Sequence, residues 1–148
     1  MIRRINILAD ALELVKNTYL SVIKNEDSLE GREYFLNNYL FDDETILSFN
    51  EGKMKIFGYY ASNDLAGIIS IDDNYYIKFL FVDKNYLKCG IGKKLLDYII
   101  NNTESNIFTC DSSIYARNFY LKYGFVQISD ICESHGMKYI KMEYKKSC

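Results

Sequence analysis

The segment from Val82 to Leu96 constrains the fold of this chain more than any other. It reads V-D-K-N-Y-L-K-C-G-I-G-K-K-L-L and follows an apolar run that ends at Val82. Beyond Gly90 and Gly92, apolar side chains recur at three- and four-residue spacing, as on one face of an amphipathic helix. The order of elements is therefore a strand, a glycine loop and a helix.

A loop of this kind can bind an anion. Backbone N–H groups in the first turn of a helix lack intrahelical partners, and the helix dipole adds partial positive charge there. Glycine lets the backbone approach a phosphate because no side chain stands between them. The same end carries three lysines, which we call the loop lysines: Lys88, Lys93 and Lys94. The segment predicts phosphate binding, and the alternative is a plain strand-to-helix turn that uses Gly for a positive φ.

The two common nucleotide motifs do not fit this loop. The phosphate loop of nucleotide hydrolases needs Gly and Ser or Thr where this chain has Leu87 and Lys94. The dinucleotide fingerprint needs a third Gly where Leu95 stands. A nucleotide-binding protein is therefore disfavoured.

The loop instead resembles that of the GNAT acetyltransferase superfamily. In that family the motif Gln/Arg-x-x-Gly-x-Gly/Ala is preceded by a hydrophobic strand that ends in Val and by a Tyr. The matching positions are Val82, Tyr86, Gly90, Ile91, Gly92, Lys93, Leu95 and Leu96. Leu87 departs from the pattern, because the family usually has Gln or Arg there.

A second stretch, from Asp111 to Phe125, resembles the GNAT helix that carries Ala, then a Phe-Tyr pair, and ends at Gly-Phe. The matching positions are Ala116, Phe119, Tyr120, Gly124 and Phe125. Ser113 stands where the family often has Asn. Taken alone, the stretch also fits a helix with an apolar face and a glycine C-cap.

The resemblance implies an α/β (α+β) fold of the GNAT type, in one domain over residues 1–148. This fold has a mixed, mostly antiparallel central sheet of about seven strands flanked by about four helices, with the fourth and fifth strands splayed apart. Hydrophobic periodicity predicts helices at 10–23, with Asp10 as N-cap, at 28–40, 90–102 and 114–123, and one helical turn at 45–49. It predicts strands at 1–7, 55–61, 65–72, 75–82, 107–110, 125–131 and 137–144, the last two turning around 134–136.

The resemblance also implies the chemistry: an amine attacks the thioester of acetyl-coenzyme A (acetyl-CoA) directly in a ternary complex. By position, the backbones of Leu80 and Val82 would bind the pantetheine arm. The pyrophosphate would bind to the loop residues Lys88, Cys89, Gly90, Ile91, Gly92 and Lys93, and further cofactor-binding candidates are Leu87 and Ser113. Tyr120 would protonate the departing thiolate, since a phenol with a pKa of about 10 is protonated at neutral pH.

The general base stays open. Many relatives place a Glu on the fourth strand where this chain has Lys78. Candidates from neighbouring loops, each of which also fits a solvated surface group, are Glu30, Asp43, Glu133 and His135. A water chain, or an amine that binds already neutral, would also serve. Cys89 lies at a helix N-terminus, where thiol pKa values fall, but direct transfer needs no nucleophile on the enzyme.

Charge and composition exclude other classes of protein. Lys plus Arg number 18 against 20 Asp plus Glu, so no basic excess is present to follow a nucleic-acid backbone. The sequence shows no signal-peptide pattern and no apolar run long enough to cross a membrane, so we expect a cytoplasmic protein. No C-x-x-C pair or His at ligand spacing is present, so we expect no metal and reduced thiols at Cys89, Cys110, Cys132 and Cys148.

The sequence therefore predicts an N-acetyltransferase that uses acetyl-CoA on a small-molecule or peptide amine, either a small amine or an N-terminal or lysyl amine. The alternative is a catalytically idle acyl-CoA-binding sensor or interaction module on the same fold. Leu87 and the missing strand base favour the alternative, whereas Tyr120 opposes it. The acceptor and the choice between monomer and homodimer stay open.

Overall fold

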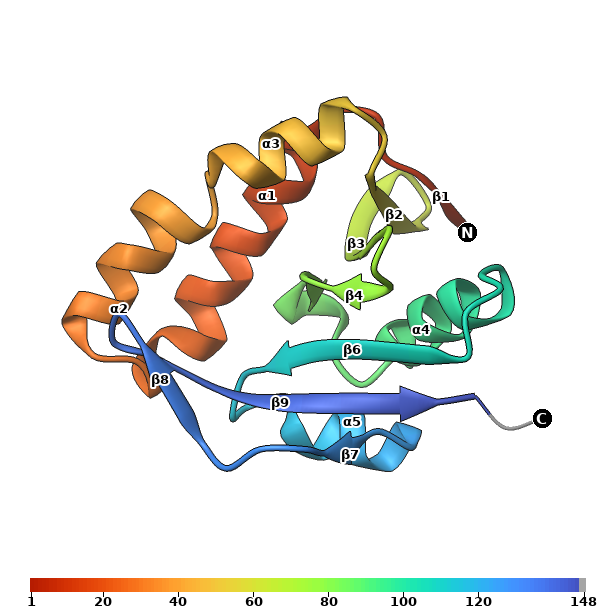
Figure 1. The fold of residues 1–148 in the computed structure, drawn as a ribbon. Helices are drawn as coiled ribbons and strands as arrows, with labels where there is room; N and C mark the ends of the chain where they lie inside the picture. The colour runs from red at the N-terminus through yellow and green to blue at the C-terminus, as the bar shows by residue number, and fades with distance from the viewer. Residues whose placement is uncertain (147–148) are drawn as a thin grey trace.

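Two sheets form the centre of the molecule in the computed structural model, which describes residues 1–146. The first is antiparallel, in the order β1 (Ile2–Arg4), β2 (Met54–Ala61), β3 (Asp64–Asp72) and β5 (Leu80–Val82). The second has the order β4 (Tyr76–Ile77), β6 (Ile107–Ser112), β9 (Met137–Lys145) and β7 (Val126–Gln127), with β8 (Cys132–Ser134) also paired to β9. Figure 1 shows β6 and β9 side by side. Cys148 lies outside the described residues.

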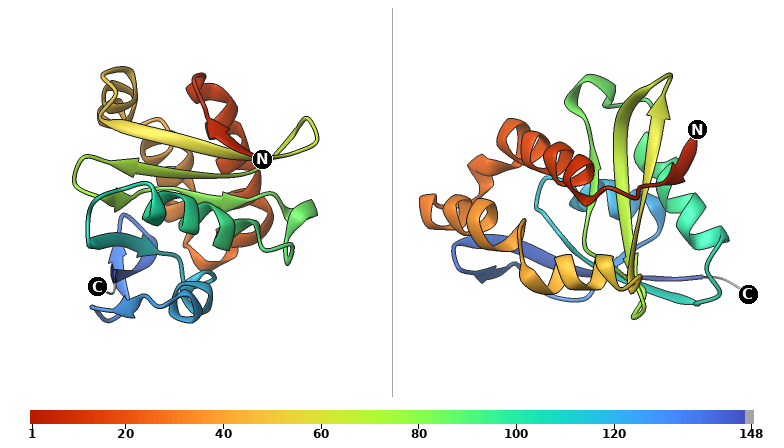
Figure 2. Two further views of the ribbon diagram at one scale, coloured as in Figure 1. Left: turned by 90° about the vertical axis from the view of Figure 1, so that its right-hand side faces the viewer. Right: turned by 90° about the horizontal axis from the view of Figure 1, so that it is seen from above.

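The helices cover both sides of these sheets. The N-terminal group is α1 (Leu8–Thr18), the π-helical turn η1 (Tyr19–Ile23), the 3-10 turn η2 (Lys24–Glu26), α2 (Leu29–Tyr34), the π-helical turn η3 (Phe35–Tyr39) and α3 (Asp43–Asn50). The later group is the 3-10 turn η4 (Lys84–Tyr86), α4 (Ile91–Asn101) and α5 (Arg117–Tyr123). Figure 2 shows α1 and α4 on opposite sides of the first sheet. The predicted mixed α/β fold is confirmed.

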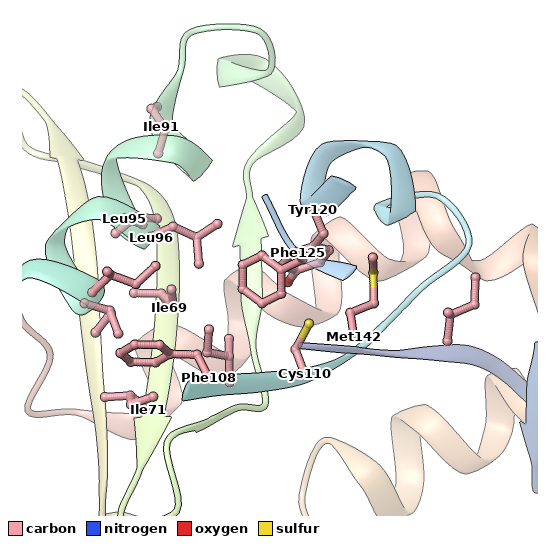
Figure 3. Close-up of a cluster of buried hydrophobic side chains, with 14 of the residues drawn as sticks. Ile69, Ile71, Ile91, Leu95, Leu96, Phe108, Cys110, Tyr120, Phe125 and Met142 are labelled. Atoms are coloured by element: carbon pink, nitrogen blue, oxygen red, sulfur yellow. The ribbon is translucent and has the colours of Figure 1, made fainter. Parts of the chain in front are cut away.

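Alternation along β3 separates the two hydrophobic cores. Ile68 faces the cluster built by α1 and η3, whereas Ile69 faces the cluster built by α4, β6 and α5. Both side chains are fully buried. Figure 3 shows the second cluster, in which Ile69 and Leu95 meet from strand and helix. β3, within the first sheet, is therefore buried on both faces.

The predicted strand 75–82 is in fact two strands, and the break between them opens the molecule. β4 pairs in parallel with β6, where Ile77 lies opposite Cys110. β5 instead pairs with β3 in the other sheet. At the break, Ser70 N donates to Phe79 O as in a regular ladder, but Phe79 N donates to Ser70 Oγ at 2.9 Å, so a side chain replaces one backbone acceptor. The splay expected between the predicted fourth and fifth strands, 75–82 and 107–110, is thus confirmed, because residues 80–82 leave β6 and pair with β3, while the expectation of one continuous strand over 75–82 was wrong.

Other boundaries differ from the prediction where local capping decides them. α1 begins at Leu8, so Asp10 lies in its first turn and is not the N-cap, whereas Ser28 does cap α2 by accepting from Gly31 N at 3.1 Å. The single turn at 45–49 is the full helix α3, because Asp42 caps it by accepting a hydrogen bond from Glu44 N.

The first and last strands are shorter than predicted. Only residues 2–4 of the expected strand 1–7 pair with β2. The expected strand 125–131 is limited to 126–127, and the hairpin at the predicted turn 134–136 joins β8 to β9. None of the helices within residues 1–146 combines the length and apolar character that a bilayer-spanning helix needs.

Candidate active site

A cavity of about 680 Å³ opens where the two sheets separate. One part, which we call the glycine-loop end, is lined by β5 and by residues 86–88 and 90–93. Another part, which we call the aromatic end, is lined by rings from η1, α2, η3, the β8–β9 turn and β9, namely Tyr19, Tyr34, Phe35, Tyr39, His135 and Tyr139. The loop after β6 and the helix α5 also line the cavity.

The candidate residues predicted from two separate stretches meet at this one cavity. It is lined by Leu80, Val82, Leu87, Lys88, Gly90, Ile91, Gly92, Lys93, Ser113 and Tyr120. Cys89 does not line it, and its exposed Sγ lies 3.7 Å from the carbonyl oxygen of Leu87.

The two glycines of the loop serve different purposes. Gly90 is the N-cap of α4 with φ 77°, a left-handed conformation that favours glycine, and a Cβ there would meet nothing within 4 Å. A Cβ at Gly92 would lie 3.0 Å from the Phe119 ring. The first helical hydrogen bond runs from Lys94 N to Gly90 O, so the amides of residues 91–93 precede it and lack helical acceptors. These amides give the glycine-loop end its capacity for an anion.

The loop lysines do not all lie at the cavity. Lys88 and Lys93 line it, and Lys93 Nζ lies 3.6 Å from Asp97 on the same helix. Lys94 does not line it, since its Nζ lies 5.4 Å from the centre of the Tyr59 ring. Two mobile positive charges therefore accompany the helix terminus.

Tyr120 is buried at the middle of the cavity. Its ring makes edge contacts with Phe119 and Phe125, with centroids 5.4 and 5.0 Å away. Burial raises the pKa of Tyr120 well above its ordinary value, and the neighbouring Cys110 thiol raises that pKa further. Figure 3 shows Tyr120 and Cys110 in the same buried group as Phe125. The phenol is therefore protonated at neutral pH and able to donate.

Ser113 holds the turn that leads to Tyr120. Its Oγ accepts a hydrogen bond from Ala116 N at 3.1 Å, and its carbonyl oxygen accepts one from Ser112 Oγ at 2.7 Å. Ala116 in turn is the N-cap residue of α5. The side chain predicted to contact a cofactor thus also shapes the backbone between β6 and α5.

Sequence reasoning missed the pairs that build the aromatic end. The Tyr19 hydroxyl donates to Asp27 Oδ2 at 2.7 Å, and Asp27 Oδ1 accepts from Lys138 N at 2.9 Å. The Tyr34 ring stacks on His135 with centroids 4.0 Å apart. These contacts join the N-terminal helical segment to β9 and to the turn before it. The partners are far apart in the sequence, so no local pattern predicts that they pair.

A second missed group lies on η3 and on the paired strands β4 and β6. The Tyr76 hydroxyl donates to Asp111 Oδ2 at 3.0 Å. Burial raises the pKa of both Tyr39 and Tyr76. Tyr39 and Asp111 line the cavity. The sequence shows that Tyr is abundant, but it does not show which Tyr hydroxyls lie close to other polar groups in the fold.

Lys78, at the position where the resemblance expects a Glu, is tied down and largely buried. Its Nζ lies 3.4 Å from Asp42 Oδ2 and donates to Thr45 Oγ1, and it sits over the Tyr39 ring at 4.5 Å. Burial lowers the pKa of Lys78, and Asp42 opposes that fall. This side chain supplies a fixed positive charge beside the cavity.

The four base candidates from the neighbouring loops are all exposed. Of these, His135 lines the cavity, whereas Glu30, Asp43 and Glu133 do not. Among residues 1–146, no group of three or more His, Cys, Asp or Glu side chains is placed to hold a metal ion.

The geometry agrees with what comparisons with known proteins find. A model of the acetyltransferase (GNAT) domain family matches residues 23–146. A search of curated proteins gives no match. Similar solved structures include a GCN5-related N-acetyltransferase from Rhodopseudomonas palustris, 17% identical with a TM-score of 0.79, over 98% of this chain and 94% of that one.

Two further structures resemble the chain over nearly its whole length. A probable acetyltransferase from Staphylococcus epidermidis is 20% identical with a TM-score of 0.72, over 99% of both chains. The PaiA N-acetyltransferase from Thermoplasma acidophilum, solved in complex with coenzyme A, is 20% identical with a TM-score of 0.62, over 98% of this chain and 99% of that one. At these identities the structures establish the fold.

Proposed function

The chain belongs to the GNAT acetyltransferase family, and from that premise we propose that it transfers the acetyl group of acetyl-CoA to an amine in a ternary complex. One observation carries the proposal: an anion-binding helix terminus and a buried, protonated Tyr120 open onto the same cavity. The first suits a pyrophosphate and the second suits a departing thiolate.

The residues at the glycine-loop end fit coenzyme A. The amides of residues 91–93, with Lys88 and Lys93 beside them, would hold the pyrophosphate. β5 is the last strand of its sheet, so the backbone groups of Leu80 and Val82 face the splay, where an amide-bearing pantetheine arm can add as a further strand. When bound, acetyl-CoA supplies an activated acetyl group.

Tyr120 would act as the general acid. An amine nitrogen attacks the thioester carbon, the carbon–sulfur bond breaks, and the Tyr120 hydroxyl gives its proton to the sulfur. The nitrogen loses one proton to water as the amide forms, and the Tyr120 oxygen takes one from water after the thiol product leaves, so the protons balance. The raised pKa of Tyr120 keeps that proton on the oxygen until the thiolate develops. The thiolate then needs no proton from water inside the cavity.

The acceptor would enter from the aromatic end. Tyr34, stacked on His135, and Tyr139 give this end apolar and aromatic walls, and the Asp27 carboxylate lines it as well. An aromatic wall with a carboxylate suits an ammonium group on an apolar body. Small amines and the amino groups of peptides both meet that description.

Turnover of acetyl-CoA tests the proposal. Purified protein would be incubated with acetyl-CoA and a panel of amines of different shape: spermidine, phenethylamine, glucosamine and a lysine-containing peptide. We expect thiol release that depends on the amine, together with an acetylated product found by mass spectrometry. Tight coenzyme A binding without transfer to any amine would refute the enzyme and favour the alternative, an acyl-CoA-binding module on which Lys78 has replaced the strand base.

A further inference from the structure

We propose that Asp111 is the general base of the transfer and takes the proton of the attacking amine on its Oδ1 atom. This inference rests on the proposed acetyltransferase function. It places the base on β6, the strand beside β4, where the expected Glu is replaced by Lys78.

Asp111 stands at the point where the two sheets separate. Cys110 and Ile77 form the last pair of the parallel ladder between β6 and β4. Asp111 is the next residue on β6 and Lys78 the next residue after β4, and both line the cavity. In the proposed binding mode the pantetheine arm lies in this splay. The thioester at its end would therefore lie beside Asp111.

Alternation along β6 separates the proton acceptor from the proton donor. Cys110 belongs to the buried cluster that also contains Tyr120, as Figure 3 shows. Asp111 is exposed and lies on the other face of the strand. A base for the nitrogen and an acid for the sulfur would thus act from opposite sides of β6.

The hydrogen bond from Tyr76 fixes the Asp111 carboxylate. The Tyr76 hydroxyl donates to Oδ2 at 3.0 Å, and burial raises the pKa of Tyr76, so this phenol stays protonated. Oδ1 has no hydrogen-bond partner among the described residues, 1–146. One oxygen is held by the protein while the other can accept from a ligand. Tyr76 is therefore a positioning residue.

The second carboxylate at the cavity is already engaged. Within residues 1–146, the carboxylates that line the cavity are those of Asp27 and Asp111. Asp27 is buried, and its two oxygens accept from the Tyr19 hydroxyl at 2.7 Å and from Lys138 N at 2.9 Å. Its negative charge can attract an ammonium group, but its oxygens hold the aromatic end together.

Two other titratable side chains at the cavity fit the role less well than Asp111. Lys78 is paired with Asp42, and an ammonium group has donors but no acceptor. His135 lies in the β8–β9 turn, beyond the last pair of β9 with β6, which joins Ile140 to Ser112. The splay is therefore served by Asp111.

The proton balance closes through water. As the nitrogen–carbon bond forms, the nitrogen gives one proton to Asp111 Oδ1. The carbon–sulfur bond breaks, and the sulfur takes the proton of Tyr120. Asp111 is exposed and passes its proton on to water, and the Tyr120 oxygen takes one from water after the thiol product leaves. Nitrogen loses one proton, sulfur gains one, and both side chains return to their starting forms.

The test compares kcat and KM of the intact chain and its variants, with acetyl-CoA and whichever amine of the panel the wild type acetylates fastest. Asp111→Asn keeps an oxygen that can accept from Tyr76 but removes the basic carboxylate. Its kcat should therefore fall about 10²-fold, with the Kd for coenzyme A within about twofold of wild type. Asp111→Glu should recover a large part of that loss, because it returns a carboxylate.

Two further variants sharpen the test. Tyr76→Phe leaves the carboxylate in place, so its kcat should fall by less than that of Asp111→Asn. The matched control is Asp73→Asn, which changes an exposed acid in the turn before β4 that does not line this cavity, so kcat should not change. Asp111 is exposed as well, so its variants should fold, as thermal unfolding would show.

Each outcome decides the proposal. Wild-type kcat in Asp111→Asn, a rise in acceptor KM alone, or equal rates in Asp111→Asn and Asp111→Glu would overturn the assignment. A loss in Tyr76→Phe as large as that in Asp111→Asn would assign the proton to the phenol instead. A wild type that binds coenzyme A but acetylates no amine would refute the proposed function and the base with it, whereas an active wild type with an unaffected Asp111→Asn refutes the base alone.

Discussion

Tyr120→Phe tests catalysis separately from folding, because the structure predicts a small loss of stability and a large loss of rate. The substitution removes one hydroxyl and keeps a ring that is packed between Phe119 and Phe125. The polar neighbour of that hydroxyl is the Cys110 thiol, which is at most a weak hydrogen-bonding partner. Loss of one weakly paired hydroxyl costs about 1 kcal/mol of folding free energy, or a fall in Tm of about 2–4 °C. A domain with about 5–15 kcal/mol of stability stays folded after that loss.

The expected loss of rate is much larger. If Tyr120 protonates the leaving sulfur, kcat should fall about 10²–10⁴-fold, equivalent to about 2.7–5.4 kcal/mol in the activation barrier. Affinity for coenzyme A should change little, because in the proposed binding mode the glycine loop holds the pyrophosphate. The assay is steady-state thiol release at saturating acetyl-CoA, with calorimetric titration of coenzyme A and thermal unfolding on the same preparation.

Tyr123→Phe is the matched control on the same helix. The Tyr123 hydroxyl donates to Asp97 Oδ1 at 2.7 Å, and a hydrogen bond to a carboxylate contributes about 1.5–3 kcal/mol. Tyr123 does not line the cavity. Tyr123→Phe should therefore cost more stability than Tyr120→Phe while it leaves kcat unchanged. Wild-type turnover in a folded Tyr120→Phe enzyme would remove Tyr120 from the mechanism.

Three further predictions address binding. Gly92→Val should abolish coenzyme A binding detectable by calorimetry, because the new side chain would block the phosphate. It should also lower stability by about 1–3 kcal/mol, because that side chain meets the Phe119 ring. Undiminished affinity would contradict the loop assignment. Lys88→Ala and Lys93→Ala should weaken coenzyme A binding at low salt and matter less at high salt, whereas Lys94→Ala should not, as titrations at two ionic strengths would show. Gly31→Ala should raise the acceptor KM without changing coenzyme A affinity, because its Cβ would come 2.1 Å from a carbonyl oxygen of the β8–β9 turn; an unchanged KM would place the acceptor elsewhere.

The glycine-loop end could be predicted because its signals are local. Seven residues contain all of them: the first turn of a helix, a glycine with positive φ and two lysines. Each would contribute to anion binding through its own backbone or its own charge. The C-cap at Gly124, with φ 124°, is equally local. Ser28 caps α2 for the same reason. Signals of this kind are complete within one segment, so sequence alone places them.

The break in the strand 75–82 could not be predicted. The run from Phe79 to Val82 is apolar and contains no glycine or other turn residue, so its pattern is that of one buried strand. The break depends on Ser70, whose Oγ accepts from Phe79 N, and on Asp42, which pairs with Lys78 from 36 residues away. Both partners lie outside the run, and the splay that opens the cavity depends on them.

The aromatic end shows why the acceptor is harder to infer than the cofactor. The Asp27 carboxylate accepts a hydrogen bond from Lys138 N, which lies 111 residues away in the sequence. Tyr34 stacks on His135 across a similar separation in the sequence. Each contact needs both segments in place, so neither residue carries a recognisable signal alone. A phosphate held by backbone amides tolerates many side chains around it, whereas an amine is selected by the side chains themselves. Substitutions at the aromatic end should therefore change which amine is acetylated while the affinity for coenzyme A stays constant, and substitutions in the glycine loop should do the reverse.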